Sequence, residues 1–150
     1  MKATETKLEG CFVLEPMIFE DKRGYFFESF NEEKFNTLIN NKVAFVQDNE
    51  SFSAKGVLRG LHYQVGEHAQ AKLVRVVKGK VLDVAVDIRK NSITFGQYVA
   101  VKCDNFYNKA SEGGITYNDP KLNIDWQLPE KELLVSEKDV VLPTLENARL

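Results

Sequence analysis

The residue best suited to acid–base chemistry in this chain is a histidine in a short apolar run. His62 is one of two histidines among 150 residues, and it lies within residues 56–64, close to Arg59. Imidazole exchanges its proton near neutral pH, so His62 can serve as a general acid or base. A core histidine held by a hydrogen bond fits the same run, and the run alone leaves both roles open.

Other side chains suit a phosphorylated or nucleotide-linked sugar as ligand. Arginine binds phosphate through a bidentate fork and lysine binds it as a point charge. Carboxylates and carboxamides hydrogen-bond to sugar hydroxyls, and aromatic rings stack on a base. None of these residue types is diagnostic alone. The candidates are Arg23, Arg59, Lys72 and Arg75 for phosphate, Glu28, Gln47, Asn49 and Glu112 for hydroxyls, and Tyr25, Phe26 and Phe27 for a base.

Apolar residues recur mainly with a period of two, which predicts a β-rich fold around these side chains. One helix is expected at residues 31–39, where Asn31 can cap the first turn, and a short one is expected to begin after Ser136. Many short strands with one early helix predict a sandwich or small barrel, formed as one domain over residues 1–150. The strand candidates are residues 25–30, 44–53, 57–64, 72–77, 81–88 and 98–107.

Strand alternation raises two questions about side-chain direction. Asp83 and Asp87 share one face of their strand, which is either solvated or lines a polar cavity. Arg59 and His62 lie on opposite faces of theirs, unless the strand is interrupted by a bulge at Gly60. Without such a bulge, Arg59 serves a different site.

Composition excludes several classes of partner. The chain is 43% hydrophobic and 28% charged, with a net charge of −2, so nothing in it attracts nucleic acid or an anionic membrane. No apolar run approaches the roughly 18 residues that span a bilayer, and the polar N-terminus does not resemble a signal peptide. Cys11 and Cys103 are expected to be thiols rather than a disulfide. We expect a cytoplasmic protein.

Motifs along nearly the whole chain resemble the dTDP-4-dehydrorhamnose 3,5-epimerase family. The most specific is Arg-Gly-Leu-His-Tyr-Gln at residues 59–64. The resemblance implies a single cupin-like epimerase domain, a jelly roll or double-stranded β-helix, that forms a homodimer and needs no cofactor and no metal. Two histidines are in any case too few for the usual cupin metal cluster. The other matching segments are residues 21–28, 45–49, 69–75, 83–89, 111–114, 118–120 and 136–139.

The resemblance also implies a reaction in dTDP-L-rhamnose biosynthesis, epimerisation of dTDP-4-dehydro-6-deoxy-D-glucose at C3 and C5 to dTDP-4-dehydro-L-rhamnose. Both carbons lie beside the C4 ketone, so removing either proton gives an enolate. By the resemblance, His62 is the base, Asp139 holds the imidazole and stabilises its protonated form, and Lys72 stabilises the enolate. The implied substrate contacts are Arg23, Glu28, Gln47, Asn49, Arg59, Glu112 and Lys138.

The chain departs from the family pattern after Val101. About three strands are missing there, ~30 residues with their turns, so the jelly roll is expected to be incomplete. The missing part includes a substrate-binding histidine and the tyrosine that acts as the acid. Tyr107 is the nearest phenol that could substitute, and it equally fits a core aromatic. Four alternatives therefore stay open: a full epimerase, a C3-only epimerase or ketoisomerase on the same substrate, an impaired sugar-nucleotide-binding remnant, and a deletion in the gene or its assembly.

Overall fold

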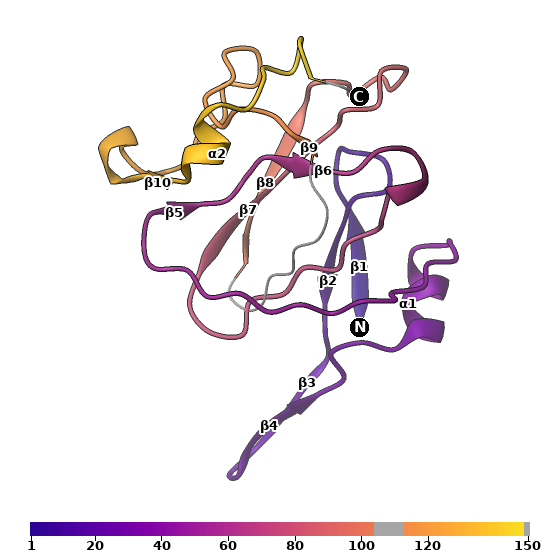
Figure 1. The fold of residues 1–150 in the computed structure, drawn as a ribbon. Coiled ribbons are helices and arrows are strands. Elements are labelled where there is room, and N and C mark those ends of the chain that lie inside the picture. The colour runs from indigo at the N-terminus through magenta and orange to yellow at the C-terminus, as the bar shows by residue number, and fades with distance from the viewer. Residues whose placement is uncertain (104–112, 149–150) are drawn as a thin grey trace. The chain divides into compact units, whose positions relative to one another are not determined.

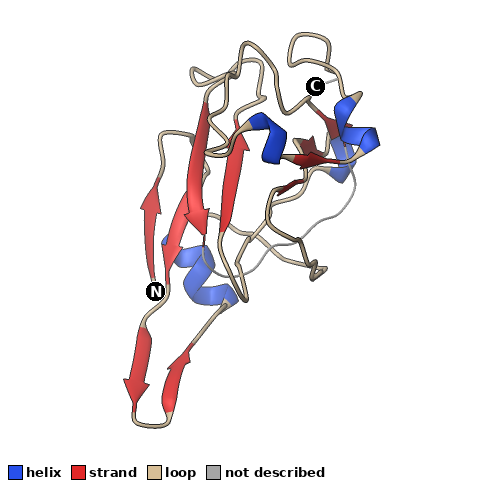
Figure 2. Cartoon of the chain, turned by 90° about the vertical axis from the view of Figure 1, so that its left-hand side faces the viewer, coloured by secondary structure: helices blue, strands red, loops and turns tan. Residues whose placement is uncertain are grey.

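A computed structural model describes residues 1–103 and 113–148 (Figure 1). Its contacts divide the chain into two compact units, Met1–Val46 and Gln47–Leu150. The single domain predicted over residues 1–150 stays a prediction. Strands form most of the regular structure and the helices are short (Figure 2), which agrees with the predicted all-β class.

The first unit holds two antiparallel strand pairs and one helix. Ile18–Asp21 and Gly24–Phe27 form a hairpin whose apolar side chains face solvent, since Ile18, Phe19, Tyr25 and Phe26 are 53–70% exposed. The elements are β1 (Lys2–Glu5) paired with β2 (Phe12–Glu15), β3 (Ile18–Asp21) paired with β4 (Gly24–Phe27), and α1 (Glu32–Leu38).

Helix α1 confirms the helix predicted at residues 31–39. The side-chain oxygen of Asn31 accepts a hydrogen bond of 3.0 Å from the backbone N–H of Lys34, so Asn31 is the N-cap. The buried Phe35 packs against the rings of Phe30 and Phe45, with centroids 5.7 and 5.4 Å away. This aromatic cluster anchors the helix.

The described residues of the second unit, 47–103 and 113–148, form three strand pairs, a four-residue helix and two turns of 3₁₀ helix. Its elements are β5 (Val57–Leu58) parallel to β10 (Leu134–Val135), β6 (His62–Tyr63) antiparallel to β9 (Gly113–Gly114), β7 (Val81–Val86) antiparallel to β8 (Tyr98–Cys103), η1 (Gly66–His68), η2 (Glu130–Glu132) and α2 (Glu137–Val140).

The hairpin of β7 and β8 is closed by a buried carboxylate. Asp87 accepts hydrogen bonds from the backbone and guanidinium of Arg89 and from the hydroxyls of Ser92 and Thr94. Arg89 is the largest cause that lowers the pKa of Asp87 well below its ordinary value. Asp87 therefore lies neither in solvent nor in a polar cavity, the two environments predicted for the strand face that it shares with Asp83.

The core of the second unit forms around Ile115, Leu122 and Leu145. Beside them Asp119 is 2% exposed, and its carboxylate accepts hydrogen bonds of 2.7–2.9 Å from three backbone N–H groups, those of Lys121, Leu122 and Leu145. Charge-assisted bonds of this kind offset the cost of burying a carboxylate. The buried Asp119 thus joins two loops.

Two predicted strands are wrong. Residues 44–53 and 72–77 pair with no other strand in the described part of the chain. A strand needs a hydrogen-bonded neighbour as well as β-forming side chains, and at Phe52, which is 89% exposed, the side chain is not covered either. Both cysteines carry thiols, as expected. No helix in residues 1–103 or 113–148 has the length and apolar composition to cross a membrane.

The contact between β5 and β10 requires a glycine. The backbone N–H of Leu134 donates to the carbonyl of Gly56 at 2.7 Å, and a Cβ on Gly56 would overlap the carbonyl oxygen of Glu132. Gly56 also has a φ of +85°, a value that other residues adopt only with strain. Only glycine lets the two strands approach this closely.

Gly56→Ala should therefore destabilise the protein more than the same change at a glycine with free space. Gly79 is the matched control, because it has a φ of +98° and an added Cβ there would meet no atom within 4 Å. We expect Gly79→Ala to cost about 1–2 kcal/mol, the usual penalty of left-handed backbone, and Gly56→Ala a further ~1–3 kcal/mol from the overlap. Denaturant unfolding measures both, and equal losses would contradict the close-approach argument.

Candidate functional site

The run that holds His62 is broken at Gly60 rather than continuous. Gly60 has a φ of +142°, and the residues on either side belong to different strand pairs, β5 with β10 and β6 with β9. Simple alternation therefore stops at Gly60, and Arg59 and His62 line the same pocket. The interruption considered for Gly60 is present, so strand alternation does not place Arg59 on the opposite side from His62.

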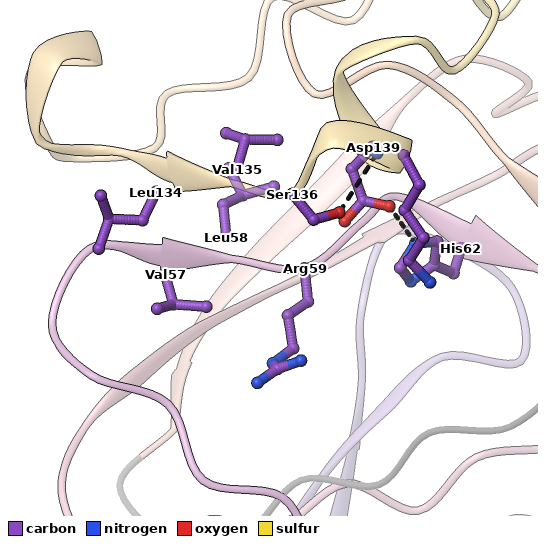
Figure 3. Close-up of a pocket in the computed structure, with 9 residues that line it drawn as sticks. Val57, Leu58, Arg59, His62, Leu134, Val135, Ser136 and Asp139 are labelled. Carbon is purple, nitrogen blue, oxygen red and sulfur yellow. Dashed lines mark hydrogen bonds and ion pairs between the residues drawn. The ribbon is translucent and has the colours of Figure 1, made fainter.

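The partner of His62 comes from the start of α2. Ser136 caps this helix, because its side-chain oxygen accepts from the backbone N–H of Asp139 at 3.3 Å. The parallel pairing of β10 with β5 brings this turn beside β6. As a result, Nε2 of His62 lies 2.9 Å from Oδ1 of Asp139, although 77 positions separate them in the sequence (Figure 3).

The pair is shielded from solvent, with side chains 9% and 4% exposed for His62 and Asp139. Burial raises the pKa of Asp139, but the hydrogen bond and charge of His62 lower it, helped by Ser136 and the backbone N–H of Gly60. The net effect holds the pKa of Asp139 below its ordinary value. The carboxylate thus stays charged and can stabilise a protonated imidazole.

The pocket around this pair has a volume of about 250 Å³. Two cations, Arg59 and Lys138, line it together with the His62–Asp139 pair. Figure 3 shows the side chain of Arg59 directed away from that pair, and its Nε donates to the hydroxyl of Ser53 at 3.0 Å. Pockets for drug-sized ligands measure about 300–1,000 Å³, so this one suits a single sugar ring better than a whole nucleotide. The remaining wall is formed by Val57, Leu58, Leu134, Val135 and Ser136.

Such an arrangement can remove a proton from carbon and hold an anion. The imidazole accepts the proton, the buried carboxylate stabilises the resulting cation, and the two positive side chains attract negative charge on the ligand. The described residues contain no group of three or more His, Cys, Asp or Glu side chains placed to hold a metal.

Four of the predicted site residues meet in this pocket: Arg59, His62, Lys138 and Asp139. Two others bond to each other, since Nε2 of Gln47 donates to Oδ1 of Asn49 at 3.0 Å. Lys72 is close enough to Asp83 for its charge to lower the pKa of that carboxyl, although burial raises that pKa by more. Asp83, the other aspartate on the strand face of Asp87, is thus partly buried beside a cation.

Two further predicted residues, Arg23 and Glu28, belong to the first unit. In the first unit, Arg23 pairs with Asp21, and Glu28 bonds to the ammonium of Lys34 at 2.8 Å, which lowers the pKa of Glu28. Glu112 and the candidate acid Tyr107 lie outside the described residues.

Sequence reasoning missed the apolar wall and the contribution of Gly60. The backbone N–H of Gly60 bonds to the carboxylate of Asp139, and Leu134 and Val135 cover the pocket from β10. No local pattern indicates that Leu134 and Val135 pair with Val57 and Leu58. The glycine at position 60 was the available signal, because it allows the backbone to turn there.

Comparison with known proteins shows which family the chain resembles. The chain matches the family model described as dTDP-4-dehydrorhamnose 3,5-epimerase over residues 5–102 and 98–147. It is 44% identical to the dTDP-4-dehydrorhamnose 3,5-epimerase of Salmonella typhimurium over 184 aligned residues, covering 100% of the chain and 98% of that relative.

Solved structures agree. The crystal structure of dTDP-4-dehydrorhamnose 3,5-epimerase from Elizabethkingia anophelis is similar with a TM-score of 0.89 and 44% identity, covering 98% of this chain and 97% of that one. The dTDP-6-deoxy-D-glucose-3,5-epimerase of Legionella pneumophila, in complex with dTDP-4-keto-L-rhamnose, has a TM-score of 0.87 and 38% identity, covering 97% and 93%. These matches confirm the predicted cupin-like jelly roll.

The comparisons also locate the departure from the family pattern. The family model matches in two segments, residues 5–102 and 98–147, so the break in the match lies within residues 98–102, inside β8. The alignment to the Salmonella relative is longer than the 150 residues of the chain, so it includes positions that the chain lacks. The break lies where the motifs predicted it, after Val101.

The pairing of His62 with Asp139 predicts a change in titration. His62→Leu removes the hydrogen bond and the positive charge but leaves the burial, so the pKa of Asp139 should rise. Carbon-13 NMR of the carboxyl group measures it. The stabilisation from the pair should be complete above the ordinary aspartate pKa of about 3.9 and should be lost as pH falls through the lowered value.

The control is the other histidine of the chain. His68 is exposed on η1, so His68→Leu should leave the titration of Asp139 as it is in the wild type. A pKa of Asp139 that does not move in His62→Leu would contradict the pairing.

Proposed function

The chain belongs to the dTDP-4-dehydrorhamnose 3,5-epimerase family of isomerases, and from this we propose that it epimerises dTDP-4-dehydro-6-deoxy-D-glucose at C3 and C5 to dTDP-4-dehydro-L-rhamnose. The observation that carries the proposal is the buried contact of 2.9 Å between His62 and Asp139. A base and a counter-charge are what proton abstraction beside a ketone requires.

In the proposed reaction, His62 takes a proton from C3 or C5. The electrons of the broken C–H bond form a C=C bond to C4, and those of the carbonyl move to its oxygen, which gives an enolate. When Nε2 of His62 donates to Asp139, Nδ1 is the nitrogen that accepts the proton. Protonation of the same carbon from the opposite face then restores the ketone with inverted configuration.

We assign roles to the other predicted residues by family and by chemistry. Lys72 would balance the negative oxygen of the enolate, and its ammonium is close enough to the carboxyl of Asp83 to influence it. Arg59 and Lys138 line the pocket and suit the diphosphate. The remaining substrate contacts are proposed to be Arg23, Glu28, Gln47, Asn49 and Glu112.

The proposed base can be tested without product release. Wild-type protein in D₂O should introduce deuterium at C3 and C5 of the substrate, read separately by NMR. His62→Ala should lower the rate by about 10²–10⁴-fold, the usual contribution of general acid–base catalysis, while His68→Ala should leave it unchanged. Equal exchange in wild type and His62→Ala would show that the base lies elsewhere, and exchange at C3 alone would favour the monoepimerase alternative.

Because the acid of the family pattern is missing, we predict that inversion slows while deuterium exchange persists. If no group donates from the face opposite His62, the enolate is reprotonated by His62 or by water, so inversion should be about 10²–10⁴-fold slower than in a full-length relative while exchange persists. If Tyr107 has taken over as acid, inversion is near normal and Tyr107→Phe removes it. Full inversion that survives Tyr107→Phe would contradict both versions.

We further propose that the protein is a homodimer. The hairpin of β3 and β4 presents Ile18, Phe19, Tyr25 and Phe26 to solvent, and a cluster of exposed apolar side chains indicates an interaction surface. A second copy of the chain fits best, because the same family pattern implies a dimer and a symmetric contact buries the patch on both copies.

Size-exclusion chromatography with light scattering should give twice the 17.1 kDa chain mass at micromolar concentration. Phe19→Ser should weaken the dimer by about tenfold or more. Ile93, which is 98% exposed outside the hairpin, provides the control Ile93→Ser with unchanged mass. A monomeric wild type would contradict the dimer, and a dimer insensitive to Phe19→Ser would place its interface elsewhere.

A further inference from the structure

Gln64 buries a side-chain amide that makes no hydrogen bond to the described residues. Both Nε2 and Oε1 are shielded from solvent, and neither has a partner among the residues that the structure describes. A buried polar group left unsatisfied costs about 1–3 kcal/mol, and native proteins contain few of them. An orphaned amide with a donor and an acceptor is therefore a group prepared for a ligand.

The direction of the strand places Gln64 on the side of His62. Leu61 and Tyr63 pack against the core of Ile115, Leu122 and Leu145. Successive side chains on an extended segment point to opposite faces, and the backbone is still extended at Val65, with φ −123° and ψ 160°. His62 and Gln64 consequently share the face away from that core.

The spacing suits one sugar ring. Residues two apart on a strand are separated by about 6.5–7 Å, which is comparable to the width of a pyranose with its substituents. A sugar positioned over His62 would extend to the amide of Gln64. Pairing of His62 with Gly114 across β6 and β9 holds this part of the backbone in place.

We propose that Gln64 is a substrate-binding residue whose amide hydrogen-bonds to the hydroxyl and keto oxygens of the sugar. This inference rests on the proposed function, since it places a sugar nucleotide in front of His62. A carboxamide stays neutral at all accessible pH values, so Gln64 cannot replace the missing acid. Its contribution is to orient the ring, with the reacting C–H directed toward the imidazole.

The test is Gln64→Met, which keeps the length of the side chain and removes both polar atoms. Calorimetry would measure the affinity for dTDP and for dTDP-L-rhamnose. We expect an unchanged affinity for dTDP and a loss of about 5–100-fold for the sugar nucleotide, because the sugar oxygens lose their partner. Without ligand, the variant should unfold at the same temperature as the wild type or higher. Gln97→Met, at an exposed glutamine, is the control for the substitution itself.

Each result decides the question. Equal affinity of wild type and Gln64→Met for dTDP-L-rhamnose would overturn the inference and leave the proposed function intact. A variant that unfolds well below Gln97→Met, or does not fold, would show that the amide supports the fold and would also overturn it. A wild type that binds neither dTDP nor the sugar nucleotide would overturn the proposed function and the inference together.

Discussion

The candidate site depends on the parallel pairing of two strands of two residues each. β5 and β10 are brought together where Gly56 lets one backbone approach the other, and this contact carries the first turn of α2 to β6. Two residues 77 positions apart thereby come within hydrogen-bond distance. A contact so short contributes little stability by itself, so its position is held by the loops around it.

Buried carboxylates hold much of that loop structure. Among the described residues, Asp87, Asp119 and Asp139 are each at most 4% exposed, and each accepts hydrogen bonds from backbone N–H groups or paired side chains. Asp87 closes a hairpin, Asp119 joins two loops, and Asp139 faces the proposed base. Long irregular segments can be ordered in this way because each carboxylate satisfies several donors at once.

The sequence anticipated elements whose signals are local. Asn31 and Ser136 cap helices that form where expected, and the alternation of residues 81–88 corresponds to β7. His62 and Asp139 were paired through family motifs, since nothing near either residue points to the other. Residues 44–53 and 72–77 have β-forming side chains but no neighbouring strand in the described part of the chain, and pairing partners are distant in sequence. The burial of Asp87 depended on Ser92 and Thr94, whose contacts only the folded turn creates.

The two ends of the hairpin of β7 and β8 differ in whether they can accept a change in chain length. Asp87 closes one end of the hairpin. At the other end Val81 pairs with Cys103, beside residues 98–102, where the two matches to the family model overlap. Residues gained or lost beyond Cys103 leave the register of the hairpin unchanged, because all of its paired residues lie between Val81 and Cys103. Evolution or engineering can therefore change the length of the chain at this point, and a segment from a longer relative could be grafted there without re-forming the strands that precede it.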